Sequence, residues 1–431
     1  MGITRSIAVI FAAAALAAAT LTAQQVARTR APRIWTDEAL KTWALPIAGV
    51  NGAPHFYTEA EYYAAPVDEL RTYPVYVKGR EPKNYREWMR KQGPKPLIEI
   101  GTSRTDAEWA AEGREIFDGL DIAHNRTDDP RALAWVDDPA AAAREHALVT
   151  NDGVIVSLRW VVDHDRTLKL TLSECGACHT RGLTDGTAIS GAQGNLNFAL
   201  SVFGPIFEHE LEVNKQLGRD RSPAEIAYAS YAVPWLADDI NASFKTMSVE
   251  ERERIDGPPS VAGTFPRFNG SPYFTNHMPD LIGVKDRKYL DATATHRNRG
   301  AEDIARYGIL VTDADDGALG PHVFEPDRVR ALHSRHSDEA MYALGKYIYS
   351  LKPPANPNRP GEETARGEQV FARSGCASCH TPPLYTNNKL VPVDGFEPFA
   401  HPNAPPAADV MNVKLGLDPG LALRTRKGTG Y

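Results

Sequence analysis

The chain has few cysteines, no excess of positive charge and, beyond its N-terminus, no long hydrophobic run. Lys and Arg number 48 against 55 Asp and Glu, a formal net charge of −7, which argues against a dedicated nucleic-acid binder. No apolar run after residue 21 approaches the length of a membrane span. Charged residues make up 24% and hydrophobic residues 42%, so long disorder is not expected. A chain of 431 residues predicts two or three domains.

The single apolar run lies at the N-terminus and has the features of an export signal. Arg5 supplies a positive charge, and Ile7 to Leu21 is apolar apart from one Thr. This length is typical of a signal peptide and short for a membrane span. We expect cleavage after Leu21-Thr22-Ala23, giving a signal peptide over 1–23 and a periplasmic or otherwise exported mature chain without a membrane span. The alternative is a buried helix or an uncleaved anchor.

All four cysteines fall in two copies of the pattern C-x-x-C-H. This is the attachment motif of c-type haem: two thiols about one helical turn apart add to the two porphyrin vinyl groups, and the His that follows binds the iron. The pattern therefore predicts two covalently attached haem c groups. The expected attachment and ligand residues are Cys175, Cys178 and His179 in the first copy, and Cys376, Cys379 and His380 in the second.

Two other uses of paired cysteines remain open. The pairs could share one zinc ion, but zinc sites of this kind usually have 15–20 residues between the pairs, and Cys178 lies far from Cys376. They could instead form two disulfides in an oxidising compartment. Both alternatives leave His179 and His380 without a role.

The pattern along the chain predicts helices around both motifs and one β-hairpin. Gly113 to Phe117 and Gly367 to Phe371 are similar and lie on expected helices, the first capped by Ser103. Another helix is expected after Ser337, ended by Pro353-Pro354. The hairpin is expected from three apolar stretches, 154–156, 160–162 and 168–172, with a turn over 163–166. The expected division is an aromatic-rich segment over 24–100 that covers the haem domains, a first haem domain over 101–352, a linker over 353–361 and a second haem domain over 362–431.

The chain resembles the dihaem c-type cytochromes related to bacterial dihaem cytochrome c peroxidases. The resemblance rests on the two C-x-x-C-H motifs, the Gly-x-x-[Ile/Val]-Phe helices and the stretch from Pro279 to Arg287, and it covers residue 100 to the end. It implies a mainly α fold with two cytochrome-c-like haem domains, long loops and a small β-hairpin insertion in the first. Family members continue beyond a stretch like Gly428 to Tyr431, so the second domain is expected to be shortened.

The sixth iron position would decide the function, because Met or His closes it and an open position allows peroxide chemistry. Met278 is the candidate for the first iron, with His277 and His296 as rivals, and Met411 is the candidate for the second. Each of these side chains could equally be structural. Two functions follow from the resemblance. One is an electron carrier with a small cytochrome or a cupredoxin as partner; the other is a peroxidase reducing hydrogen peroxide, or a related oxygenase.

Overall fold

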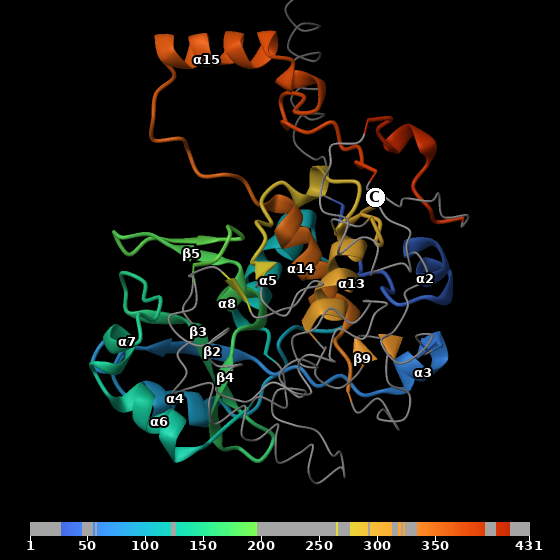
Figure 1. Ribbon diagram of the computed structural model, residues 1–431. Coiled ribbons are helices and arrows are strands. Elements are labelled where there is room, and N and C mark those ends of the chain that lie inside the picture. Colours follow the sequence, from blue (N-terminus) through green and yellow to red (C-terminus); the bar gives the residue numbers. More distant parts are fainter. Residues whose placement is uncertain are drawn as a thin grey trace, which may run out of the picture.

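A computed structural model describes a chain that is mixed and mostly helical. In the described residues there are ten α-helices and several small antiparallel sheets, as Figure 1 shows. The expectation of a mainly α fold with a small β component is confirmed at this level. The expected signal peptide over 1–23 lies outside the described residues. These are residues 27–44, 55–56, 58–121, 126–195, 264–265, 276–291, 294–312, 318–319, 322–323, 334–392 and 402–413.

Three helices form the centre of the molecule: α5 (Asp106–Gly119), α13 (Ala301–Thr312) and α14 (Asp338–Ser350). A Cβ built on Gly113 of α5 would lie 1.9 Å from the carbonyl oxygen of Ala343, so only glycine permits this approach to α14. Next to it, the ring centroids of Phe117 and Tyr347 lie 5.3 Å apart. The first and last helices of the range 101–352 are therefore packed directly on each other.

Helix α14 begins as expected, whereas α5 begins at a different residue. The Ser337 hydroxyl accepts a hydrogen bond from the Ala340 amide at the start of α14. In α5 the cap is Thr105, not Ser103. Its hydroxyl accepts from the Glu108 amide, and the Glu108 carboxylate accepts from the Thr105 amide at 2.7 Å. The prediction of a Ser103 cap was wrong because this reciprocal box satisfies two amides at once.

The expected hairpin is present and has a third strand that the sequence pattern did not indicate. Strands β3 (Val154–Val162) and β4 (Leu168–Leu172) pair in antiparallel register. Strand β2 (Thr72–Tyr76), from the N-terminal segment, pairs with β3 to give the order β2-β3-β4. Strand β4 then leads through Ser173 into the short helix α8 (Glu174–Cys178). The sheet thus carries the first C-x-x-C-H motif at its end.

The N-terminal segment contributes to the core as well as to the sheet. Trp35, Trp43 and Tyr62 are fully buried in the same apolar cluster as α5, α13 and α14. The Arg306 side chain donates to the carbonyl of Ile34 at 2.6 Å, and Ile34 in turn donates its amide to Asp338 at 3.0 Å. Its helices are α2 (Asp37–Trp43), α3 (Glu59–Ala64) and α4 (Tyr85–Gln92).

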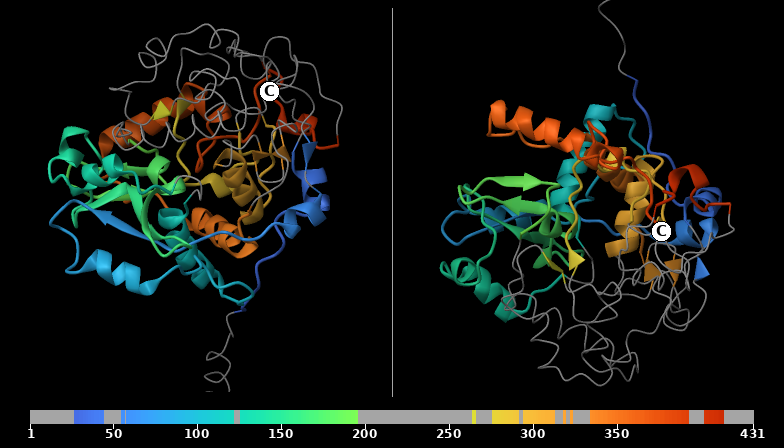
Figure 2. Two further views of the ribbon diagram at one scale, coloured as in Figure 1. Left: turned by 90° about the horizontal axis from the view of Figure 1, so that it is seen from below. Right: turned by 45° about the horizontal axis from the view of Figure 1, so that its top comes forward.

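The remaining elements surround these two cores. Helices α6 (Pro130–Asp137) and α7 (Ala141–Arg144) share a second apolar cluster with the sheet. Helix α15 (Glu362–Arg373) lies beyond the Pro-rich stretch that follows α14. It stands apart from the other elements in Figure 1, with two further views in Figure 2, and buries none of its residues. No helix in the described ranges is long and apolar enough to span a bilayer. The other elements are β1 (His55–Phe56), β5 (Thr180–Gly182), β6 (Ala188–Ser190), β7 (Thr264–Phe265), β8 (Asn276–His277), β9 (Ala318–Leu319), β10 (His322–Val323) and the 3-10 turns η2 (Val284–Asp286), η4 (Cys376–Ser378) and η5 (Ala407–Asp409).

Candidate haem attachment sites

The first motif lies on one helical turn held between α5 and the sheet. The His179 amide donates to the Cys175 carbonyl at 2.9 Å, which closes the turn. A Cβ on Gly176 would lie 3.3 Å from the Phe117 carbonyl oxygen, so α8 packs closely on the end of α5. Cys175 is partly buried against the main core. This turn places the two thiols as covalent attachment to one porphyrin requires.

The imidazole of His179 has a defined proton position. Its Nδ1 lies 2.9 Å from the backbone oxygen of Pro279. A carbonyl oxygen only accepts hydrogen bonds, so Nδ1 carries the proton and Nε2 keeps the lone pair. Burial lowers the pKa of His179, which favours the neutral ring. Nε2 is therefore the nitrogen able to bind iron, because a backbone carbonyl fixes the tautomer in this way for metal-binding histidines.

The second motif repeats this arrangement with different residues. The His380 amide donates to the Cys376 carbonyl at 2.9 Å, and Nδ1 of His380 lies 3.1 Å from the Tyr385 carbonyl oxygen. The same reasoning places the proton on Nδ1 and the lone pair on Nε2.

A comparison with family models, curated proteins and solved structures found no match to the chain. Any function proposed for the chain therefore rests on the geometry of the two motifs.

An apolar surface lies around the second motif. Val370, Leu384 and Tyr385 are 46%, 49% and 55% exposed. Gly367 corresponds to Gly113 in the repeat, yet a Cβ there would meet nothing within 4 Å. Large exposed apolar side chains gathered in one place usually mark a surface that something covers. A porphyrin attached at Cys376 and Cys379 would cover apolar surface here, so the residues fit the group.

The four cysteines, all among the described residues, remain in two separate pairs. None of them forms a disulfide. Among the residues that the structure describes, which include all four cysteines, no three His, Cys, Asp or Glu side chains gather as a metal site. The two C-x-x-C pairs therefore stay separate, whereas one zinc ion would need them together.

Met278 lies beside the first motif. It directly precedes Pro279, whose carbonyl accepts from Nδ1 of His179. Its side chain is 3% exposed. A Cβ on Gly194 would lie 3.2 Å from the Met278 sulfur and 2.1 Å from the Cys178 carbonyl oxygen. Met278 is thus a buried side chain packed close to Gly194. Ligation by Met278 stays a prediction.

Of the other candidate sixth ligands, Met411 lies near its motif and His296 does not. The Met411 sulfur is 4.0 Å from Nδ2 of Asn387, and the Asn387 amide donates to the Cys379 carbonyl at 2.8 Å. His296 is fully buried, with Nδ1 2.9 Å from Asp291 and its ring 4.7 Å from that of Trp43. The side chain of His277 lies outside the described residues. Ligation by Met411 also stays a prediction.

One short segment contacts both motifs. Pro279 accepts from His179, and Leu281 donates its amide to Gly191, which itself donates to the His179 carbonyl. Seven residues after Pro279, the carbonyl of Asp286 accepts from Nδ2 of Asn388 at 2.8 Å. Asn388 follows the Asn387 that contacts Cys379. Sequence patterns did not identify these contacts, because Pro279 is 100 residues from His179 and carbonyl acceptors carry no residue-type signal.

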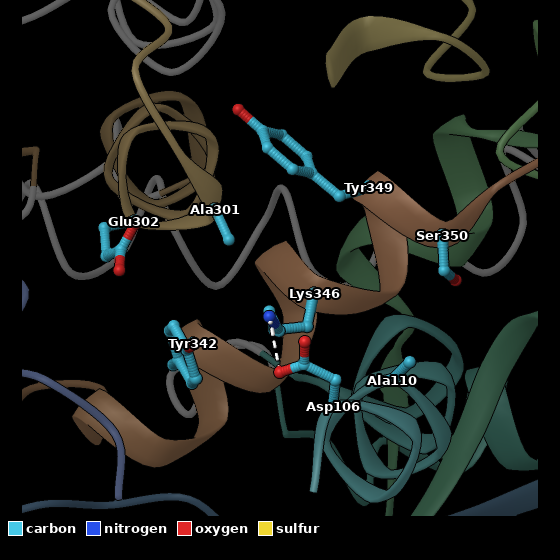
Figure 3. Close-up of a pocket in the computed structure, with 8 residues that line it drawn as sticks. All are labelled: Asp106, Ala110, Ala301, Glu302, Tyr342, Lys346, Tyr349 and Ser350. Atoms are coloured by element: carbon cyan, nitrogen blue, oxygen red, sulfur yellow. Dashed lines mark ion pairs between the residues drawn. The ribbon is translucent and has the colours of Figure 1, made fainter. Parts of the chain in front are cut away.

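One cavity in the described part of the chain belongs to neither motif. It has a volume of about 330 Å³ and lies between α5, α13 and α14, as Figure 3 shows. The ion pair between Lys346 and Asp106, 2.7 Å long, lies on one side of it. No residue of either C-x-x-C-H motif lines it. Its lining consists of Asp106, Ala110, Ala301, Glu302, Tyr342, Lys346, Tyr349 and Ser350.

Proposed function

We propose that the chain is an exported dihaem c-type cytochrome that attaches two haem c groups and transfers electrons. The observation that carries the proposal is the matched state of His179 and His380. Each follows two thiols, closes a helical turn on the first of them, and has its Nδ1 at a backbone carbonyl, which leaves Nε2 as a ligand. Neither zinc nor disulfide chemistry requires this tautomer in both copies.

The roles of the residues follow from this geometry. Cys175 and Cys178 would form thioethers to one porphyrin, and Cys376 and Cys379 to the other. A bound haem supplies an iron that gains and loses one electron. The chain holds Nδ1 of each His at a neutral backbone carbonyl, which leaves Nε2 of each ring as the atom that would bind iron. A neutral carbonyl partner increases the basicity of the ligand less than a carboxylate partner would.

The segment 279–286 gives the proposal a connection between the two sites. Its first residue accepts from His179, and its last accepts from Asn388, next to the residue that contacts Cys379. These hydrogen bonds link the two motifs through one short segment, and two attached haems would be connected through it. We therefore propose that electrons pass between the two haems. A small cytochrome or a cupredoxin would be the external partner.

The close packing of buried Met278 against Gly194 leads to a second candidate function, a dihaem peroxidase. If Met278 is a packing residue and not a ligand, it would leave the sixth position of the first iron open. An open position allows peroxide chemistry. The chain would then reduce hydrogen peroxide at one site with electrons delivered through the other. A related oxygenase would use the same open position with oxygen and an organic substrate.

Absorption spectra of the protein purified from the periplasm test the proposal. We expect c-type haem bands in the oxidised and reduced protein, and a pyridine haemochrome that counts two haems per chain. A high-spin band that changes on addition of peroxide would favour the peroxidase. Two low-spin haems whose spectra do not change on addition of peroxide would favour the electron carrier. A chain purified after co-expression with haem-attachment enzymes that shows no haem band would refute both. Release of the protein by osmotic shock checks its location.

A further inference from the structure

The region around α4 has a charge opposite to that of the whole chain. Residues 71–95 contain eight Lys or Arg and two Asp or Glu, a formal charge of +6, in a chain whose net charge is −7. The haem motifs lie outside this region. A concentrated positive area on a negative protein attracts negatively charged partners and speeds their association.

The basic side chains gather at the C-terminal end of α4. Arg90 and Lys91 lie in its last turn, and Arg166 lies beside Gly93, with its guanidinium 3.4 Å from a Cβ built there. Lys95 accepts a backbone hydrogen bond from Arg71 at 2.8 Å, which brings these two residues together next to it. All five side-chain positions are exposed. We call this group the α4 basic surface; it comprises Arg71, Arg90, Lys91, Lys95 and Arg166.

The acidic groups that face this surface are largely engaged elsewhere. On α4 itself Glu87 pairs with Lys91 at 2.7 Å. From the turn between β3 and β4, Asp163 and Asp165 both pair with Lys169, at 2.7 and 3.4 Å. From α6, Asp137 pairs with Lys78 and Arg86, neither of which belongs to the α4 basic surface. Among the ion pairs of the described residues, Glu87 is thus the one acidic partner of a member of this surface, and the area keeps a net positive charge.

An exposed tryptophan lies next to the α4 basic surface. Trp88 is 47% exposed, although its neighbour Met89 is fully buried. Its ring stacks on Tyr85 with the planes 10° apart and meets the edge of Tyr73 at 5.4 Å. Trp88 is thus held rigid while half of it faces solvent. A rigid aromatic side chain beside Arg residues is the usual composition of a binding hot spot between proteins.

The surface and the first motif belong to one structural unit. Tyr73, which supports Trp88, pairs across the sheet with Trp160 of β3. Trp160 pairs in turn with Leu170 of β4, and β4 continues into α8 with Cys175 and Cys178. α4, α6 and the sheet lie together on one side of the molecule in Figure 1. A partner seated on Trp88 would therefore be connected to the first motif through this three-stranded sheet.

We propose that the α4 basic surface, together with the adjacent Trp88, is the docking surface for an acidic redox protein that exchanges electrons with the first haem. The inference rests on the proposed function and adds the charge of the partner and the place where it binds. An anionic membrane would also be attracted by basic residues. A protein is favoured because one rigid tryptophan, supported by tyrosines that are themselves buried or half-buried, offers a small specific contact rather than an apolar face for insertion.

The test measures binding of a probe, reduced plastocyanin, which is a cupredoxin with an acidic surface. Its dissociation constant with the holoprotein is measured by fluorescence anisotropy of labelled plastocyanin at low and at physiological ionic strength. We expect Arg90→Glu with Lys91→Glu to weaken binding at least tenfold at low salt, and Trp88→Ala to weaken it about tenfold at both ionic strengths, because contacts in an interface centre are not screened. Stopped-flow electron transfer should slow in parallel, while reduction by dithionite stays unchanged.

A charge-matched control separates this surface from net charge. Lys352 and Arg359 are exposed beyond α14 and away from α4, so Lys352→Glu with Arg359→Glu changes the net charge equally. Binding within twofold of wild type is expected for this control. The inference is overturned if both double variants bind plastocyanin equally weakly, or if neither binds it more weakly than wild type. It is also overturned if Arg90→Glu with Lys91→Glu abolishes binding to phosphatidylglycerol vesicles and leaves plastocyanin binding unaffected. The haem absorption bands and the reduction by dithionite test the proposed function. Fluorescence anisotropy tests docking, and it does so even if the chain carries no haem.

Discussion

The same substitution in the two copies of the repeat should have opposite effects on stability. Gly113 and Gly367 occupy corresponding positions in α5 and α15. A Cβ on Gly113 would lie 1.9 Å from the Ala343 carbonyl oxygen, whereas one on Gly367 would meet nothing within 4 Å among the residues described. Real Cβ contacts are not shorter than 3.0 Å, so Gly113→Ala forces α5 and α14 apart by about 1 Å.

The magnitude follows from two opposing effects. Replacing glycine by alanine inside a helix gains about 1 kcal/mol of helix propensity. Overpacking a core costs about 1–3 kcal/mol, and the upper end applies to Gly113 because the obstacle is backbone and not a flexible side chain. Gly113→Ala should therefore lose about 2 kcal/mol, which lowers the unfolding temperature by about 4–8 °C for a unit of this size. Gly367→Ala should be neutral or gain up to about 1 kcal/mol.

Differential scanning calorimetry of the holoprotein checks both values. The transition that contains α5 and α14 should shift down only in Gly113→Ala, and a Gly113→Ser variant should be destabilised at least as much. Equal shifts in the two alanine variants, or a Gly113→Ala protein as stable as wild type, would show that the close approach of α5 and α14 is not as described.

Three further predictions concern the motifs. Gly194→Ala should reduce the haem content at the first motif, measured by pyridine haemochrome, because its Cβ would lie 2.1 Å from the Cys178 carbonyl oxygen; unchanged content contradicts the packing. Met278→Leu preserves volume and should leave both spin states unchanged at a cost below about 1.5 kcal/mol. Conversion of one haem towards high spin in the resonance Raman spectrum, with a lowered potential, would instead establish Met278 as a ligand. His179→Ala should destabilise one haem and the fold around it, since the ligand couples binding to folding; a native visible spectrum would refute its role.

Local patterns in the sequence predicted those parts of the fold that depend on nearby residues. The hairpin over 154–172 and the start of α14 at Ser337 follow from alternation and capping, and both are confirmed. Strand β2 was not predicted, because Pro74 lies in its middle and proline argues against a strand. The strand tolerates this proline because β2 is at the edge of the sheet, and on its outer side there is no partner strand to which a backbone N–H would have to donate.

In the candidate site, too, only the features that depend on nearby residues could be predicted from the sequence. Haem attachment stays a prediction, but the turn formed by each motif was predictable because its cysteines and its His lie within five residues. The Pro279 carbonyl that sets the tautomer of His179 was not, since it comes from 100 residues away and any residue type offers a carbonyl. The buried position of Trp35 and Trp43 was also missed, because an aromatic-rich segment fits a covering layer as well as a core.

The number of haem groups attached to the chain tests the central proposal most directly. Intact-mass spectrometry under denaturing conditions should detect two covalent haems on the wild-type chain. It should detect one on Cys175→Ala with Cys178→Ala, one on Cys376→Ala with Cys379→Ala, and none when all four cysteines are replaced. A wild-type chain carrying no haem after co-expression with haem-attachment enzymes, or haem retained in the fourfold variant, would contradict the assignment.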